Sequence, residues 1–126
     1  MIIGLGIDIV EIARLRATLQ RSGQRFLDYV FTPGEQSAAP ESERQRYAYF
    51  AARWAAKEAL SKALGCGIGA KCAFKEIEVQ NNELGKPNLA LSGQAAATAA
   101  ELGIKRLHLS LSHERDYACA VTIAEN

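Results

Sequence analysis

The sequence predicts a single small α+β domain over residues 1–126, with an antiparallel-rich sheet and a long central helix. Two observations lead to this fold class. Short runs of alternating apolar residues occur near both ends of the chain and in its second half, as half-buried strands require. Between them lies one long helical pattern crowded with alanine. A chain of 126 residues can bury one hydrophobic core but not a second.

The N-terminal region changes from strand to helical periodicity. Residues 2–10 are mostly β-branched and apolar, which predicts a largely buried strand. Gly4 and Gly6 within it indicate a bulge or a place where another backbone approaches closely. Apolar residues then recur at helical spacing, so residues 11–22 are expected to form a helix that stops near Gly23.

The rest of the chain alternates between helical and strand patterns. Proline and glycine mark residues 33–40 as a loop region, and the alanine-rich helix then runs from Pro40 or Ser42 to Gly65. Ser92 is expected to cap a short helix that ends at Gly103. Alternating apolar residues predict strands at residues 77–79, 89–91, 107–112 and 117–123.

Composition excludes several classes of function. Fifteen Lys and Arg residues against fourteen Asp and Glu leave a net charge of +1, so no overall field attracts nucleic acid or a membrane surface. No segment approaches the roughly 18–20 apolar residues of a membrane span, and the N-terminus lacks the basic region of a signal peptide. Cys66, Cys72 and Cys119 form no CxxC pair, which favours reduced thiols. We therefore expect a cytoplasmic protein with no nucleic-acid or membrane partner.

Asp8 and Glu58 are the first candidates for chemistry. A carboxylate in an apolar strand is costly to desolvate unless a cation or a hydrogen-bond donor meets it, and Glu58 shares a helical face with Trp54 and Lys62. Taken singly, each acid is better explained by an ion pair or a backbone hydrogen bond. Taken together, they suit Mg²⁺, which takes one or two carboxylates, several waters and phosphate oxygens of a substrate. Lys62 and Arg53 would then meet such a phosphate.

Two other patterns carry less chemistry. The glycine-rich residues 65–69 follow a helix instead of joining a strand to a helix, so they are no dinucleotide fingerprint. Ser112 and His113 are neighbours on a strand and point to opposite faces, which argues against a serine hydrolase with Asp116.

A further feature concerns a partner. Arg14, Arg21 and Arg25 fall on one line of the first helix if that helix continues past Gly23. The stripe is either a solvated helix face or a docking surface for an acidic protein helix.

Four segments of the chain together resemble the 4′-phosphopantetheinyl transferases, and in particular their small bacterial members. The resemblance covers nearly the whole chain, and the block Trp54-Ala55-Ala56-Lys57-Glu58-Ala59 is its most specific part. The other segments are Gly4-Leu5-Gly6-Ile7-Asp8-Ile9-Val10, Gly85-Lys86-Pro87 and Leu109-Ser110-Leu111-Ser112-His113. The resemblance implies transfer of phosphopantetheine from coenzyme A to a serine of apo acyl carrier protein, in fatty acid biosynthesis.

The resemblance also implies roles for individual residues. Asp8 and Glu58 correspond to Mg²⁺ ligands, and Lys62 to the catalytic residue that contacts the pyrophosphate. For the general base, we place Glu58 first, acting through a water molecule, and Asp8 second. The remaining coenzyme A contacts would come from Arg53, Ser61, Gly65, Lys86, Pro87 and His113. Arg14, Arg21 and Arg25 would receive the carrier protein. The small members of the family are homotrimers with the active site between subunits.

Two alternatives remain at this point. The chain could bind an acidic carrier without catalysis, or it could hydrolyse the pyrophosphate of coenzyme A with Mg²⁺.

Overall fold

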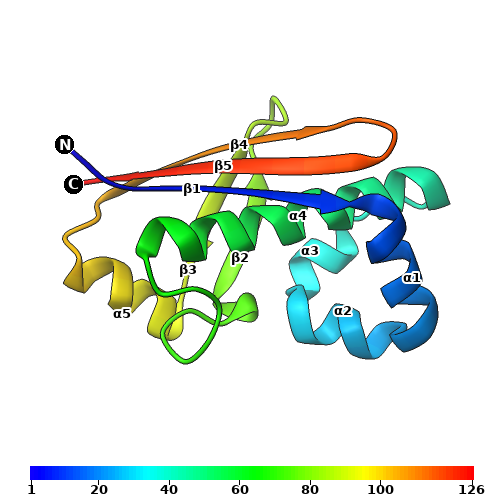
Figure 1. The fold of residues 1–126 in the computed structure, drawn as a ribbon, viewed down its shortest axis with the longest axis horizontal. Helices are drawn as coiled ribbons and strands as arrows, with labels where there is room; N and C mark the ends of the chain where they lie inside the picture. Colours follow the sequence, from blue (N-terminus) through cyan, green and yellow to red (C-terminus); the bar gives the residue numbers. More distant parts are fainter.

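The computed structural model describes residues 1–126, and it shows a sheet packed along one long helix (Figure 1). Strands β1, β5 and β4 form an antiparallel sheet in that order, and the hairpin of β2 and β3 is a separate two-stranded sheet behind α4. The two chain ends lie together, since the Asn126 amide donates to the carbonyl oxygen of Met1. The elements are β1 (Ile2–Glu11), α1 (Ile12–Ser22), α2 (Gln24–Val30), α3 (Pro33–Ser37), α4 (Glu43–Leu64), the 3₁₀ helix η1 (Phe74–Glu76), β2 (Ile77–Asn81), β3 (Pro87–Leu91), α5 (Gly93–Glu101), β4 (Arg106–His113) and β5 (Tyr117–Glu125).

The backbone of β1 lies directly against the backbone of α4. A Cβ atom added at Gly4 would lie 1.9 Å from the carbonyl oxygen of Ala63, and one added at Gly6 would lie 1.8 Å from that of Ala59. No side chain fits in either place, so the predicted close approach at the two glycines is confirmed. Alanine on α4 and glycine on β1 together bring the strand close enough for polar side chains of the two elements to meet.

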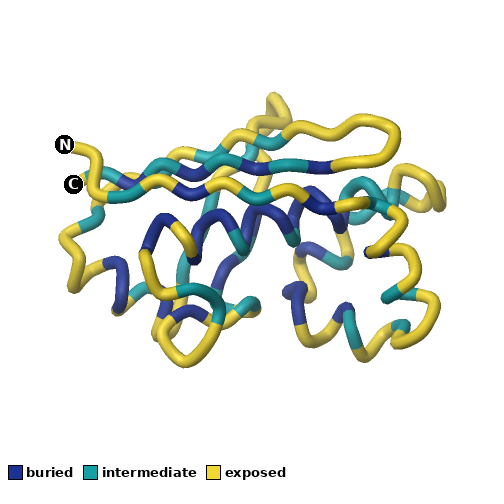
Figure 2. Tube along the Cα trace, in the orientation of Figure 1, coloured by how far each residue is buried: buried dark blue, intermediate teal, exposed yellow.

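Buried segments run along α4 (Figure 2), and the buried side chains around this helix form two clusters. The larger cluster surrounds the N-terminal part of the helix and includes Leu15, Phe31 and Phe50. A smaller cluster surrounds its C-terminal end and includes Leu60 and Ile77. Because both clusters pack on the same helix, α4 connects the two parts of the core. No helix is both long and apolar enough to span a membrane.

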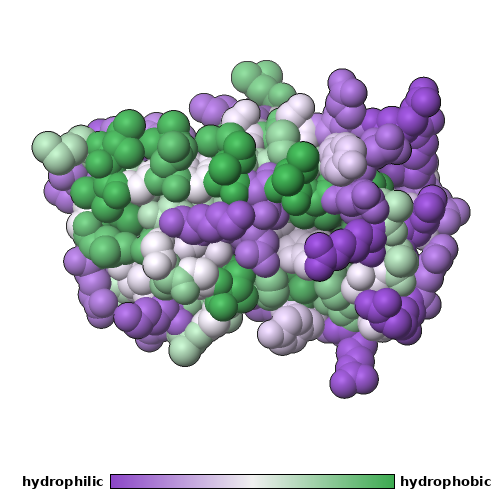
Figure 3. All heavy atoms as spheres, in the orientation of Figure 1, coloured by the Kyte–Doolittle hydropathy of each residue, from purple (hydrophilic) through white to green (hydrophobic).

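The outer face of β1 is exposed, although the sequence predicts a largely buried strand. Leu5, Ile7 and Ile9 are 64, 62 and 65% exposed, while Val10 on the opposite face is buried. Figure 3 shows hydrophobic side chains gathered in a band over this strand. The prediction was wrong for this face because an apolar strand pattern does not indicate whether the same chain covers the strand.

The region after Gly23 contains two short helices that the sequence pattern does not reveal. The expected loop over residues 33–40 is instead occupied largely by α3, and α2 precedes it. Helices of seven and five residues are too short to show apolar periodicity. A local signal is present, since Thr32 and Glu35 form a capping box around Pro33 at the start of α3.

The other predicted elements are confirmed, with one change at a helix start. Helix α4 ends at Gly65, whose φ of 81° is left-handed, and the strands of both hairpins occupy the predicted segments. Ser92, however, makes no side-chain hydrogen bond to α5. A carboxylate oxygen of Glu76 accepts instead from the backbone N–H of Gln94 at 2.7 Å. Ser92 therefore occupies the predicted N-cap position, but Glu76 of η1 and not the serine hydroxyl accepts from the first turn of α5.

Candidate active site

Asp8 and Lys62 meet where β1 crosses the C-terminal half of α4. The Lys62 Nζ donates to Asp8 Oδ1 at 3.1 Å and to the carbonyl oxygen of Ile7 at 3.0 Å. Gly4 and Gly6 lie four and two residues before Asp8, so all three are on the same face of β1. The Asp8 carboxylate therefore faces the helix. The close packing at the glycines thus brings the predicted acid and the predicted lysine together.

Glu58 lies one helical turn before Lys62 and completes a three-residue cluster. Burial raises the pKa of the Glu58 carboxyl, the negative charge of Asp8 raises it further, and the positive charge of Lys62 lowers it. No side-chain or backbone group donates a hydrogen bond to this carboxylate. The two acids are therefore close enough for the charge of Asp8 to raise the pKa of Glu58, and the charge of Glu58 is only partly compensated.

The chemistry of this donor set fits a magnesium ion. Asp8 and Glu58 supply hard carboxylate oxygens, and no third His, Cys, Asp or Glu joins them in a metal-binding group. Mg²⁺ commonly takes only one or two carboxylates and fills its remaining positions with water and substrate phosphate. A zinc site would need three or four protein ligands, commonly His or Cys.

Ser61 and Gly65 occupy the same end of α4 in different ways. Ser61 is fully buried, and its hydroxyl donates to the carbonyl oxygen of Glu58 at 2.7 Å. That bond supports the helical turn from which the Glu58 side chain projects. A Cβ at Gly65 would meet no atom within 4 Å, so the backbone at the helix end is open to a ligand.

Arg53 projects from α4 on the side of β2, away from Asp8. Its guanidinium lies 3.8 Å above the ring of Tyr49, and its Nη2 donates to Asn81 Oδ1 at 3.4 Å. The residue is only 9% exposed, and its Nε has no hydrogen-bond partner. Desolvation lowers the pKa of this guanidinium, while Tyr49 acts in the opposite direction. One buried donor thus remains available for an additional acceptor.

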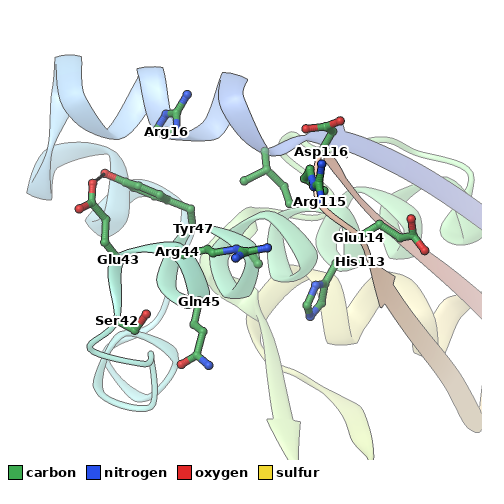
Figure 4. Close-up of a pocket in the computed structure, with 12 residues that line it drawn as sticks. Arg16, Ser42, Glu43, Arg44, Gln45, Tyr47, His113, Glu114, Arg115 and Asp116 are labelled. Carbon is green, nitrogen blue, oxygen red and sulfur yellow. Dashed lines mark hydrogen bonds between the residues drawn. The ribbon is translucent and has the colours of Figure 1, made fainter.

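His113 lies in a separate hollow of about 960 Å³ beyond the end of β4 (Figure 4). The hollow is also lined by Arg16, Arg44 and Arg115, which the sequence patterns did not single out. These cations suit an anionic ligand, although acidic side chains also line the hollow. Along the sheet, Asp8 pairs with Ala120 and Ala120 with Leu111, so within one chain His113 is separated from Asp8 by β5.

Lys86 and Pro87 lie at the turn of the hairpin between β2 and β3. Asn82 Oδ1 accepts from the backbone N–H of Lys86 at 2.9 Å, which holds the turn. Both residues line a shallow hollow against the outer face of β4 and β5, where His108 and Val121 lie. In one chain this position, too, is distinct from the Asp8 cluster.

The three arginines of the expected stripe are all exposed, but they do not share one helix. Arg14 and Arg21 belong to α1. The chain turns at Gly23, whose φ is 53°, and Arg25 belongs to α2. The expected continuous helix past Gly23 is therefore wrong, and the exposed arginines are distributed over two successive helices.

Lys57 and Glu35 are a buried ion pair that sequence reasoning missed. The Lys57 Nζ lies 2.7 Å from Glu35 Oε1, and both side chains are 0% exposed. A signal was present, because Lys57 falls on the same helical line as Leu60 and Leu64 and therefore on the buried face of α4. A lysine on such a face requires a buried partner.

Comparisons with known proteins agree with this fold. Residues 4–122 match the model of the 4′-phosphopantetheinyl transferase superfamily. The chain is 53% identical to the holo-[acyl-carrier-protein] synthase of Edwardsiella ictaluri over 125 residues, which cover 98% of each chain.

Solved structures show the same α+β architecture. The holo-[acyl-carrier-protein] synthase of Neisseria meningitidis superposes with a TM-score of 0.92 at 36% identity, and the match covers 100% of both chains. The Helicobacter pylori enzyme in complex with coenzyme A superposes with a TM-score of 0.85 at 31% identity, over 96% of this chain and 99% of that one. The predicted fold class and the resemblance are both confirmed, and the chain belongs to the 4′-phosphopantetheinyl transferase superfamily.

Proposed function

We propose that residues 1–126 form one transferase domain that moves 4′-phosphopantetheine from coenzyme A to a serine of apo acyl carrier protein. The serine oxygen forms a bond to the β-phosphorus of coenzyme A, and the phosphorus–oxygen bond to the nucleotide breaks. Adenosine 3′,5′-bisphosphate leaves, and the serine proton passes to a base. The observation that carries this proposal is the Asp8–Glu58–Lys62 cluster in a chain 53% identical to a holo-[acyl-carrier-protein] synthase.

Asp8 and Glu58 are the residues that would hold Mg²⁺. When bound, the ion supplies positive charge that stabilises the oxygens of the pyrophosphate during transfer. Lys62 adds a second positive charge on the same side, half exposed and already aimed at Asp8. Phosphoryl transfer depends mainly on positioning and electrostatic stabilisation, so two acids and a lysine are sufficient for the chemistry.

Glu58 is the first candidate for the general base, acting through a water molecule, and Asp8 is the second. The partial burial that raises the pKa of Glu58 makes its carboxylate a stronger base than a solvated one. Asp8 already accepts a hydrogen bond from Lys62, whereas no group of the chain donates to the Glu58 carboxylate.

The nucleotide half of coenzyme A would be held outside the carboxylate cluster. His113 lies in a hollow rich in arginine, and Arg53 has a buried donor without a partner, so both suit phosphate oxygens. Lys86 and Pro87 would lie on the adenine side, at the hairpin turn. Gly65 and Ser61 would border the pyrophosphate. The backbone at Gly65 is open to a ligand, and the Ser61 hydroxyl supports the helical turn of Glu58.

The full site would require a second copy of the chain, in a homotrimer with active sites between subunits. Within one chain, β5 separates His113 from Asp8, so one ligand would more readily contact both positions across a subunit boundary. The exposed Leu5, Ile7 and Ile9 form an apolar surface beside Asp8 that a neighbouring copy would cover. Stable interfaces between identical subunits are typically apolar in this way.

The carrier protein would dock on the exposed arginines of α1 and α2. Arg14, Arg21 and Arg25 concentrate positive charge on this side of a chain whose net charge is only +1. An acidic helix of the carrier would be guided there by charge complementarity.

One experiment separates this proposal from its alternatives. The protein is incubated with coenzyme A, Mg²⁺ and an apo acyl carrier protein, and the carrier is then weighed by mass spectrometry. A carrier heavier by one phosphopantetheine group supports transfer. Free phosphopantetheine without a carrier adduct would indicate hydrolysis, and carrier binding without a change in coenzyme A would indicate a non-catalytic binding protein.

A further inference from the structure

The buried pair of Lys57 and Glu35 connects five elements of the fold. Besides Glu35, the Lys57 Nζ donates to the carbonyl oxygen of Val30 at 2.7 Å and to that of Phe74 at 3.0 Å. These acceptors lie on α2, α3 and η1, whereas Lys57 itself belongs to α4. All three ammonium protons thus have acceptors within the protein.

Glu35 is equally well satisfied. Its Oε1 accepts from the backbone N–H of Thr32 at 2.9 Å, and its Oε2 accepts from that of Val79 on β2 at 2.7 Å. Desolvation lowers the pKa of Lys57, and the negative charge of Glu35 opposes that effect. The pair is therefore a fully hydrogen-bonded polar network at the centre of the fold, which gives it a single defined geometry.

The position of this network relates the two proposed working surfaces to each other. Lys57 directly precedes Glu58, so the helical segment that presents the carboxylate cluster is the segment anchored by the network. On its other side the network holds Val30, the last residue of α2, the helix that carries Arg25. Helix α1, with Arg14 and Arg21, packs on both α2 and α4.

Stability alone does not account for such an arrangement. Replacing a buried ion pair by apolar residues of similar volume is often neutral or stabilising, because both charges are costly to desolvate. In some proteins, buried polar networks of this kind are retained because they specify one geometry. Here the geometry that it defines is that of α2 and α3 relative to α4.

We propose that Lys57 and Glu35 are positioning residues that set the carrier-docking helices at the correct place relative to the Asp8–Glu58 cluster. This inference rests on the proposed function. Removing the network should leave coenzyme A affinity unchanged, because the packing of Gly4 and Gly6 against α4 and the Lys62–Asp8 hydrogen bond still hold the cluster. It should weaken productive docking of the carrier, because α2 loses its hydrogen bond to α4.

The test is the double substitution Lys57→Met with Glu35→Gln, which leaves no unpaired buried charge. We expect the KM for the carrier to rise about tenfold or more, while the affinity for coenzyme A stays at the wild-type value. In a protein that already carries Arg14→Glu and Arg21→Glu, the substitutions at Lys57 and Glu35 should raise the KM for the carrier by much less than tenfold. The reason is that docking is already impaired in that protein. Glu101→Gln with Lys105→Met is the matched control, at two exposed positions at the end of α5 and just after it, and should change neither quantity.

Two measurements keep the outcomes distinct. Coenzyme A binding and thermal unfolding show that the double variant is folded. If it does not fold, Lys57→Gln with Glu35→Gln, which keeps an amide donor at position 57, takes its place and should give a smaller rise in KM. A folded variant with a wild-type KM for the carrier, or an equal loss of coenzyme A affinity, would overturn the inference. Absence of transfer by the wild-type chain would instead overturn the proposed function.

Discussion

Lys62 and Asp8 are 54 positions apart in the chain, yet the ammonium of one donates to the carboxylate of the other at 3.1 Å. The contact exists because glycine on β1 and alanine on α4 let the two backbones touch. The charges of both residues affect the pKa of Glu58, one helical turn from Lys62. Glycine at alternate positions of the first strand thus lets a strand acid, a helix acid and a helix lysine form one cluster.

Substitution Glu58→Gln is expected to abolish transfer and to stabilise the protein in the absence of metal. The pKa of Glu58 is raised in the folded state, so at neutral pH its ionised form opposes folding. In the wild-type chain that opposition should decrease as the pH falls through the folded pKa, and it should vanish below the unfolded value near 4.3. Thermal unfolding without Mg²⁺ at neutral and acidic pH, together with the carrier mass assay, measures both effects. An unaffected transfer rate would remove Glu58 from the site.

Substitution Gly6→Ala is expected to destabilise the protein and to impair transfer together. The added Cβ would lie 1.8 Å from the carbonyl oxygen of Ala59, so β1 must move away from α4. Overpacking of this kind costs about 1–3 kcal/mol or more. Gly69→Ala is the control, since a Cβ there meets no atom within 4 Å and its φ is not left-handed. Thermal unfolding and activity of the two variants provide the comparison, and equal behaviour would contradict the proposed role of the close approach.

Mixing two inactive variants tests whether the active site is shared between copies. Asp8→Asn and His113→Ala should each abolish or greatly reduce transfer when assayed alone. If the two residues serve one site from different subunits, subunit exchange should create some sites with both residues intact and restore part of the activity. Activity that stays at the level of the separate variants, despite exchange shown by native mass spectrometry, would argue for a site within one chain.

Substitution Arg14→Glu with Arg21→Glu should weaken carrier binding much more than coenzyme A binding. Both side chains are exposed on α1 and form no ion pair within the chain, so their reversal leaves the core unchanged. Raising the salt concentration should reduce wild-type carrier binding in the same direction, because charge steering is screened. Isothermal titration calorimetry with the carrier and with coenzyme A measures the two affinities separately. Equal losses for both ligands would indicate misfolding.

Local patterns were sufficient to predict much of the fold and the central cluster. Gly4 and Gly6 predict the close approach, and Asp8 and Glu58 stand out because a half-buried acid requires compensation. The short helices α2 and α3 were missed because five to seven residues show no periodicity, and Arg25 was therefore assigned to the wrong helix. The exposure of β1 could not be predicted, since a pattern of apolar residues does not identify what covers them.

The ion pair of Lys57 with Glu35 was missed for a different reason. Glu35 lies 22 positions away in a segment that was expected to be a loop, so no spacing rule connects the two residues. Only the tertiary arrangement of α3 against α4 brings the pair together. The residues that line the hollow around His113 were missed for the same reason, because they come from three separate parts of the chain.

The central claim is that Asp8 and Glu58 together hold one divalent ion, and Mn²⁺ binding followed by electron paramagnetic resonance tests it most directly. The wild-type protein with coenzyme A is expected to bind Mn²⁺, and added Mg²⁺ is expected to displace the Mn²⁺. Asp8→Asn and Glu58→Gln should each lose that binding, while Glu101→Gln should retain it. Wild-type Mn²⁺ affinity in either of the first two variants, with the fold intact, would contradict the account.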